Sequence, residues 1–518
     1  MKERIIINLF CVLILFSLVP TIPILASYDF TEDEHIDYSN CGCSNVIFEE
    51  GQNHNQMYSI MKKPIDCSKL TITQKEFSTI DVPEEFSWRD FEGEDYTTIA
   101  KNQGNCGSCW DFAAMGALES RIEIREECSK LNPDLSEQYV LSCLPAAANY
   151  YGEGCWGGTP YGAYYYMMNE SEEGNHRNGA IPETCFTYQA SDDILCSEKC
   201  PDWEDHLIPI SDCEEVFFGL SYDSPENRET IKSLIYEYGP IAAAMNVTTD
   251  FINYWSLHHN SDDYYPDTNE PWGNMLNHII VILGWKDDPS IDNGGYWICK
   301  NSWDIEWGYH GFFNIEYGGL FTGMYFSWAD YDPESVDWAP VSDAGGLYQG
   351  KIGEDIEFDG LDSVDAEGDI VSYTWDFGDN TTGSGVNPTH SYDSEGIYIV
   401  TLTVEDSTSN TATDTALVGV GQSPINIDIK GYLGFTLIVE SDLDEVLTNL
   451  EWNAEISGIV IGGVRQGIIP ILSDTQGFSY NSLLFGLGPG SITINVENIA
   501  KTERFIIIGP FLFGLNIR

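Results

Sequence analysis

One stretch of the chain decides the fold of its first half: NQGNCGSCWDFAAMGALE, residues 102–119. From Asp111 to Glu119 the pattern is helical, so the sequence predicts a helix with Cys109 at its N-terminus. The helix dipole and the unpaired N–H groups at such an end favour a thiolate. Taken alone, the CGSCW run also fits a disulfide staple or half of a zinc site.

Two later segments favour catalysis over these alternatives. NHIIVILGW (277–285) places His278 at the start of an apolar strand, and GYWICKNSW (295–303) places Asn301 directly after another strand. A thiol nucleophile needs a base to accept its proton, and that base needs a third group to hold its ring and tautomer. Cys109, His278 and Asn301 supply these three groups.

With these motifs, residues 82 to about 337 resemble the papain family of cysteine proteases. Three further segments match in the same order: VPEEFSWRD (82–90), LSEQ (135–138) and CWGG (155–158). The resemblance implies an α+β catalytic domain with a helical lobe and a β-barrel-like lobe. It also implies peptide-bond hydrolysis without a cofactor or a metal ion.

Carried over by position, the resemblance implies that Cys109 is the nucleophile and His278 the general base and then acid. Asn301 would orient the imidazole under the cover of Trp303. Gln103 and the backbone N–H of Cys109 would form the oxyanion hole, since both direct donors at the developing charge. The implied substrate-binding residues are Gly157 and Gly158 against the peptide backbone, and a mainly apolar pocket of Thr159, Pro160, Ala244, Leu276 and Ile279.

The cysteines divide into assigned and open positions. The resemblance implies disulfides between Cys106 and Cys155 and between Cys143 and Cys196. Cys299 lies in an apolar strand, so we expect a buried thiol there. Sequence cannot separate the three pairings of Cys128, Cys185, Cys200 and Cys213, and Cys41, Cys43 and Cys67 have no assignment.

One position departs from the family pattern. Asp304 stands where relatives usually have glycine. If the backbone there needs a positive φ, Asp tolerates that conformation better than most residues.

The N-terminal residues predict export. Lys2 and Arg4 precede the apolar run 5–18, and a small-residue cleavage site follows, as in a signal peptide over 1–26. An uncleaved signal anchor is the alternative. Residues 27–81 are predicted to be a pro-segment that folds over the cleft, and a disordered, disulfide-pinned extension is the alternative.

After residue 337 the pattern changes to short alternating strands. Residues 340–421 resemble a polycystic-kidney-disease-type (PKD) repeat, which implies an immunoglobulin-like sandwich, and alternation along 398–404 supports a half-buried strand. Asp376 and Asp379 fit turn capping better than calcium binding. Residues 422–518 are predicted to form a second all-β domain of sandwich type, with the apolar run 505–513 as a buried closing strand.

Composition limits the function classes. The 83 acidic and 23 basic side chains leave a formal net charge of −60, which argues against a nucleic-acid partner, and 13% aromatic residues argue against a disordered acidic chain. We therefore predict a secreted or cell-surface, monomeric cysteine endopeptidase acting on peptides or proteins. Its β-modules would contact cell-surface or insoluble protein. The alternative is a catalytically silent papain-like domain in a surface adhesion or binding protein.

Overall fold

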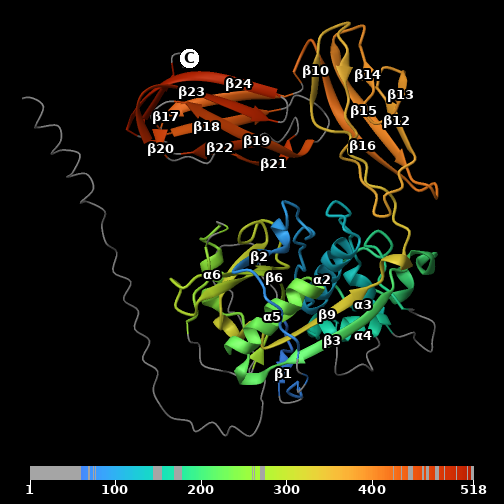
Figure 1. Ribbon diagram of the computed structural model, residues 1–518, viewed down its shortest axis with the longest axis vertical. Coiled ribbons are helices and arrows are strands. Elements are labelled where there is room, and N and C mark those ends of the chain that lie inside the picture. Colours follow the sequence, from blue (N-terminus) through green and yellow to red (C-terminus); the bar gives the residue numbers. More distant parts are fainter. Residues whose placement is uncertain are drawn as a thin grey trace, which may run out of the picture. The chain divides into compact units, whose positions relative to one another are not determined.

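The computed structural model describes residues 60–514, except for 68–69, 74, 76, 144–153, 169–177, 260, 262, 269–274, 424, 433, 441–446, 458–459, 462–465, 473–477, 483–484, 497–498 and 510. The predicted signal peptide and residues 27–59 of the predicted pro-segment lie outside the described residues. Figure 1 shows helices and strands together in the first part of the chain and strands in the later part, drawn from orange to red.

The first domain is built on a seven-stranded antiparallel sheet with the order β3-β9-β4-β6-β7-β8, in which β2 also pairs with β6. Its strands are β2 (Glu85–Ser87), β3 (Ile210–Phe217), β4 (Ile241–Met245), β6 (His278–Asp287), β7 (Gly295–Lys300), β8 (Phe312–Glu316) and β9 (Tyr325–Tyr331). A two-stranded antiparallel sheet joins β1 (Ile65–Asp66) to β5 (Met275–Leu276).

Five helices are described in this domain: α2 (Cys109–Arg125), α3 (Glu137–Cys143), α4 (Pro160–Met168), α5 (Pro225–Tyr238) and α6 (Thr249–Trp255). The limits of α5 follow from its sequence. The Ser224 hydroxyl accepts the N–H of Asn227, Pro225 occupies the first turn, and Gly239 ends the helix with φ of 88°. Helix α2 packs on β4, β6 and β9, so Cys109 lies beside the central strands.

The central strands are buried on both faces. Along β6, Ile279 and Val281 pack with α2, α3 and α4, whereas Ile280 and Ile282 pack with α5 and a cluster of aromatic side chains. This separation follows from the two-residue period of a strand. The continuous apolar sequence of β6 therefore contributes side chains to two hydrophobic cores. His278 is the first residue of this strand.

The PKD region forms a five-stranded sheet with the order β10-β16-β15-β12-β13 and a two-stranded sheet of β11 and β14. Alternation along β15 is confirmed, because Val400, Leu402 and Val404 are fully buried. The strands are β10 (Tyr348–Gly350), β11 (Ile356–Glu357), β12 (Ser372–Asp376), β13 (Thr382–Ser384), β14 (Thr389–His390), β15 (Gly396–Glu405) and β16 (Thr411–Val420).

The last region is also built from strands. A three-stranded sheet has the order β17-β18-β22, and a six-stranded sheet has the order β21-β19-β23-β24-β25 with β20 paired to β23. Their bounds are β17 (Asn426–Tyr432), β18 (Gly434–Glu440), β19 (Leu447–Ser457), β20 (Val460–Ile461), β21 (Gln466–Leu472), β22 (Phe478–Ser482), β23 (Phe485–Val496), β24 (Ile499–Gly509) and β25 (Phe511–Gly514). The described residues of the run 505–513 thus belong to two paired antiparallel strands, β24 and β25, where one closing strand is expected from the sequence.

No helix within the described part of the chain has both the length and the apolar character that crossing a membrane requires.

Candidate active site

Cys109 is the first residue of α2, as the sequence predicts, and its side chain is completely buried. The preceding loop is anchored covalently by the disulfide between Cys106 and Cys155. The N–H of Gly107 also donates to the carbonyl of Cys155 over 2.9 Å. The disulfide and this hydrogen bond therefore fix the loop that leads into α2, and with it the position of the Cys109 thiol.

His278 begins β6, and its Nε2 lies 2.8 Å from Oδ1 of Asn301. The same Oδ1 accepts the N–H of Ser302 over 2.8 Å, which identifies it as the oxygen of the amide. Nε2 must therefore donate, so the neutral ring keeps Nδ1 as its proton acceptor. Nδ1 is buried without a hydrogen-bond partner among the described residues, and Trp303 stacks on the ring with centroids 4.6 Å apart.

Gln103 lies in the loop before α2 and is fully buried. It contacts Cys106 of the same loop and Ser302, which follows β7. Its backbone N–H donates to the carbonyl of Ser302 over 3.0 Å, and its Oε1 accepts the Ser302 hydroxyl over 2.7 Å. Nε2 donates one hydrogen to the carbonyl of Cys106 over 2.8 Å. An amide nitrogen carries two hydrogens, so one remains to be directed at a substrate oxygen.

Burial governs the protonation of both reactive groups. It raises the pKa of the Cys109 thiol to about 12, although backbone N–H groups oppose this shift. Burial also lowers the pKa of His278 to about 4, against the opposing hydrogen bond to Asn301. Burial therefore favours the neutral thiol and the neutral imidazole, and it opposes the thiolate that the helix end favours.

The cover over Cys109 comes from the chain's own residues 60–67. The N–H of Met61 donates to the carbonyl of Asn277 over 2.9 Å, and the N–H of Lys63 donates to the carbonyl of Trp156 over 2.7 Å. Further along, Ile65 pairs with Leu276. Met61 is only 2% exposed and belongs to the same buried cluster as Cys109. The segment thus lies across the site, with bends at Lys62 and Lys63 and the strand β1 at Ile65–Asp66.

The two glycines expected at the substrate backbone have different surroundings. A Cβ on Gly157 would lie 2.6 Å from the carbonyl oxygen of Lys63, so this glycine does allow an extended peptide to approach. A Cβ on Gly158 would lie 2.5 Å from the ring of Trp110. The second glycine is therefore required by packing on α2.

The residues expected to line the specificity pocket come together in part. Ala244, Leu276 and Ile279 are fully buried in one cluster that also contains Met61 and Ile65. Pro160 starts α4, and Thr159 is 7% exposed just before it. From residues 60–67, Met61 and Ile65 are thus buried in the same cluster as these three residues.

The disulfides expected from the resemblance are both present, since Cys143 is also bonded to Cys196. A third bond joins Cys185 to Cys200, a pairing that the sequence left open. Among the described residues, Cys128 and Cys213 carry no disulfide, and Cys299 is a fully buried thiol.

Asp304 adopts a φ of 79°, the conformation for which glycine is favoured. Its Oδ2 accepts the Asn102 side-chain N–H over 2.9 Å. This bond ties the strained residue to the loop that carries Gln103, so the substitution keeps the backbone conformation and adds an anchor.

Sequence reasoning missed Met61, Ser302 and Asn277. Asn277 directly precedes His278, and its side chain binds the backbone of Val247 twice: Oδ1 accepts the Val247 N–H over 2.7 Å, and Nδ2 donates to the Val247 carbonyl over 3.0 Å. No local signal marks Met61, because its role depends on a contact with a distant part of the chain.

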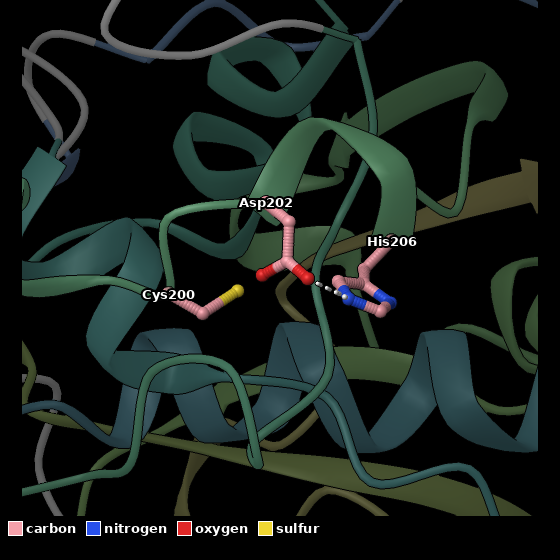
Figure 2. A group of neighbouring side chains, drawn as sticks. All are labelled: Cys200, Asp202 and His206. Carbon is pink, nitrogen blue, oxygen red and sulfur yellow. Dashed lines mark ion pairs between the residues drawn. The ribbon is translucent and has the colours of Figure 1, made fainter.

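One group of side chains in the described residues has metal-ligand spacing: Cys200, Asp202 and His206 (Figure 2). His206 Nε2 lies 3.5 Å from Asp202 Oδ2. The sulfur of Cys200 is bonded to Cys185. A disulfide sulfur is not a thiolate, so this group lacks the soft ligand that zinc prefers.

Comparisons with known proteins agree with this geometry. The model of papain family cysteine proteases matches residues 82–324, and the PKD domain model matches 337–420. Cathepsin Z of Onchocerca volvulus is 32% identical over 240 residues, which is 45% of this chain and 70% of the relative. Pro-cathepsin H of Bos taurus is 29% identical over 266 residues, 51% of this chain and 69% of the relative.

Solved structures of similar proteins include digestive procathepsin L2 proteinase from Tenebrio molitor larval midgut. It is 24% identical, with a TM-score of 0.38 over 48% of this chain and 69% of that chain. The sequence match to cathepsin Z decides the assignment. The chain belongs to the papain family of cysteine peptidases and carries a PKD domain after its peptidase domain.

Proposed function

We propose that the chain is a secreted endopeptidase that hydrolyses peptide bonds through Cys109, His278 and Asn301. The observation that supports this mechanism best is the orientation of His278. Its Nε2 is held by Asn301, its Nδ1 has no partner among the described residues, and the next residue, Ile279, belongs to the cluster that contains Cys109. An imidazole whose Nε2 is held by a hydrogen bond, and whose Nδ1 keeps a free lone pair, can accept a proton from a nearby thiol.

The reaction begins when Nδ1 of His278 takes the thiol proton and the sulfur of Cys109 attacks the peptide carbonyl carbon. The remaining N–H of Gln103 and the N–H of Cys109 stabilise the oxyanion. The C–N bond then breaks, and the imidazolium gives its proton to the leaving amine. Water, deprotonated by the same ring, attacks the thioester, and the carboxylic acid and the free thiol are released.

Residues 60–67 hold the peptidase in a latent form in this proposal. They cover Cys109 and occupy the pocket that a substrate would need, so hydrolysis requires that they leave the cleft. Opening the site to water also removes the burial that keeps the thiol and the imidazole neutral. The thiolate and imidazolium pair would then form only after this segment has moved away.

Secretion is proposed on the N-terminal sequence and on the disulfides, which persist in oxidising compartments. The PKD domain and the last strands are proposed to hold the enzyme on cell-surface or insoluble protein. Small-peptide hydrolysis tests the catalytic part of the proposal without involving these modules.

The test is a peptide-library digestion by the full chain with and without a thiol alkylator, repeated with Cys109→Ala. We expect the alkylator and Cys109→Ala each to abolish hydrolysis. Cys128→Ala, which removes another buried thiol of the same domain, should leave hydrolysis unchanged. Hydrolysis that persists in Cys109→Ala would reject the mechanism. A folded wild-type chain that cleaves nothing, even after residues 60–67 are displaced, would favour the catalytically silent alternative.

A further inference from the structure

Trp156 lies beside residues 62 and 63 and is 57% exposed. It ends a short 3-10 turn, Gly154–Trp156. The neighbouring Cys155 is bonded to Cys106, and its N–H donates to Asp192 Oδ2 over 2.9 Å. Both links hold the turn in place. An aromatic ring this exposed on an anchored turn is available to a ligand at little cost in ordering.

The chain's own segment shows which chemistry this ring accepts. The ammonium of Lys62 lies over the indole, 5.3 Å from the ring centroid. The next residue, Lys63, donates its N–H to the carbonyl of Trp156 over 2.7 Å. Trp156 therefore accepts a backbone hydrogen bond from Lys63 and a cation–π contact from Lys62, both in the segment 60–67. A tryptophan face is the aromatic surface that attracts an ammonium or guanidinium most strongly.

The negative charge around the turn also favours a cationic ligand. The carboxylate of Asp192 lies against Cys155, directly beside Trp156 in the sequence. The whole chain carries a formal net charge of −60. A negative field of this kind raises the local concentration of cationic peptides and repels anionic ones.

We infer that Trp156 is a specificity-determining residue that binds a Lys or Arg side chain of the substrate once residues 60–67 have left. Lys62 occupies this subsite in the latent form. The inference rests on the proposed peptidase function and adds its substrate class, peptides with a basic side chain at the position that Lys62 fills. At an exposed site a cation–π contact corresponds to roughly a two- to fivefold preference.

The test compares pairs of fluorogenic peptides that differ at one position, Lys against norleucine and Arg against citrulline, with the full chain. Each ratio of kcat/KM is taken on one protein sample, so the fraction of molecules still covered by residues 60–67 cancels. The variants are Trp156→Leu, which removes the aromatic face, and Trp156→Phe, which keeps one. Trp203→Leu is the control, since Trp203 has a lysine ammonium 4.4 Å from its ring on another turn.

We expect the wild-type chain to prefer Lys and Arg at one position. Trp156→Leu should reduce this preference two- to fivefold, and Trp156→Phe and Trp203→Leu should retain most of it. An unchanged Lys-to-norleucine ratio in Trp156→Leu, with peptides still cleaved, would overturn the inference and leave the peptidase proposal standing. Equal cleavage of Lys and norleucine peptides by the wild-type chain would overturn it as well. A folded wild-type chain that cleaves no peptide, even after residues 60–67 are displaced, would overturn both proposals.

Discussion

Replacing Met61 by alanine tests whether residues 60–67 control access to Cys109. Met61 is 2% exposed and packs in the cluster that contains Cys109, so alanine removes three heavy atoms from a buried position. Truncation of a buried Met side chain lowers the stability of the packed state by about 2–3 kcal/mol, the lower end of the observed range. This loss applies only while residues 60–67 cover Cys109, so it shifts the equilibrium toward the uncovered state. Since about 1.4 kcal/mol is a factor of ten, the uncovered state should become about 30- to 150-fold more populated.

The assay is the rate at which iodoacetamide modifies Cys109 in the full chain, followed by mass spectrometry of the Cys109 peptide. If opening is fast compared with alkylation, the rate is proportional to the uncovered population. Met61→Ala should therefore accelerate modification by the same factor, and Met61→Leu, which conserves volume, should change it little. Ile72→Ala is the matched control, because Ile72 lies in the same N-terminal region and is 52% exposed. Equal rates for Met61→Ala and the wild-type chain would refute the reasoning.

Three other outcomes follow from burial and hydrogen bonding. Burial raises the pKa of Glu123 to about 9 and that of Glu183 to about 7, so at these two carboxyl groups the folded state binds more protons than the unfolded state above pH 4.5, which outweighs the opposite shift at His278. The free energy of unfolding, measured with urea on an inactive variant, should therefore fall as pH rises from 5 to 8, and a rise would contradict this. Burial likewise raises the pKa of Asp111, and both of its carboxyl oxygens lack partners among the described residues. Asp111→Ala should therefore stabilise the fold by about 1–3 kcal/mol at pH 8. The gain should be smaller at pH 5, where the carboxyl group of the unfolded chain is less ionised. Asn301→Ala removes the acceptor of His278 Nε2 and of the Ser302 N–H, so the melting temperature should fall and kcat/KM should fall about tenfold or more at a temperature where the variant is still folded. Full activity in the folded variant would exclude the orienting role of Asn301.

Local sequence was sufficient for much of the architecture and of the site. The start of α2 at Cys109 and its helical course through Glu119 could be predicted, because a helical pattern depends on near neighbours in the chain, whereas its end at Arg125 was not predicted. The same holds for the alternation along β15. The roles expected of Cys109, His278 and Asn301 came from recognisable short motifs. The structure brings His278 and Asn301 into hydrogen-bond contact and buries Cys109 in the adjoining cluster.

The tertiary structure decided what depends on distance between remote segments. Residues 60–67 lie on a site whose other parts begin more than thirty residues later, so no local pattern could reveal that Met61 covers Cys109. The bond between Cys185 and Cys200 was one of three possible pairings until their spatial separation was known. The opposite pKa shifts of the Cys109 thiol and the His278 imidazole also depend on the fold, because burial acts through all surrounding atoms. Sequence determines which groups are available, whereas only packing determines which of them meet and how much water remains between them.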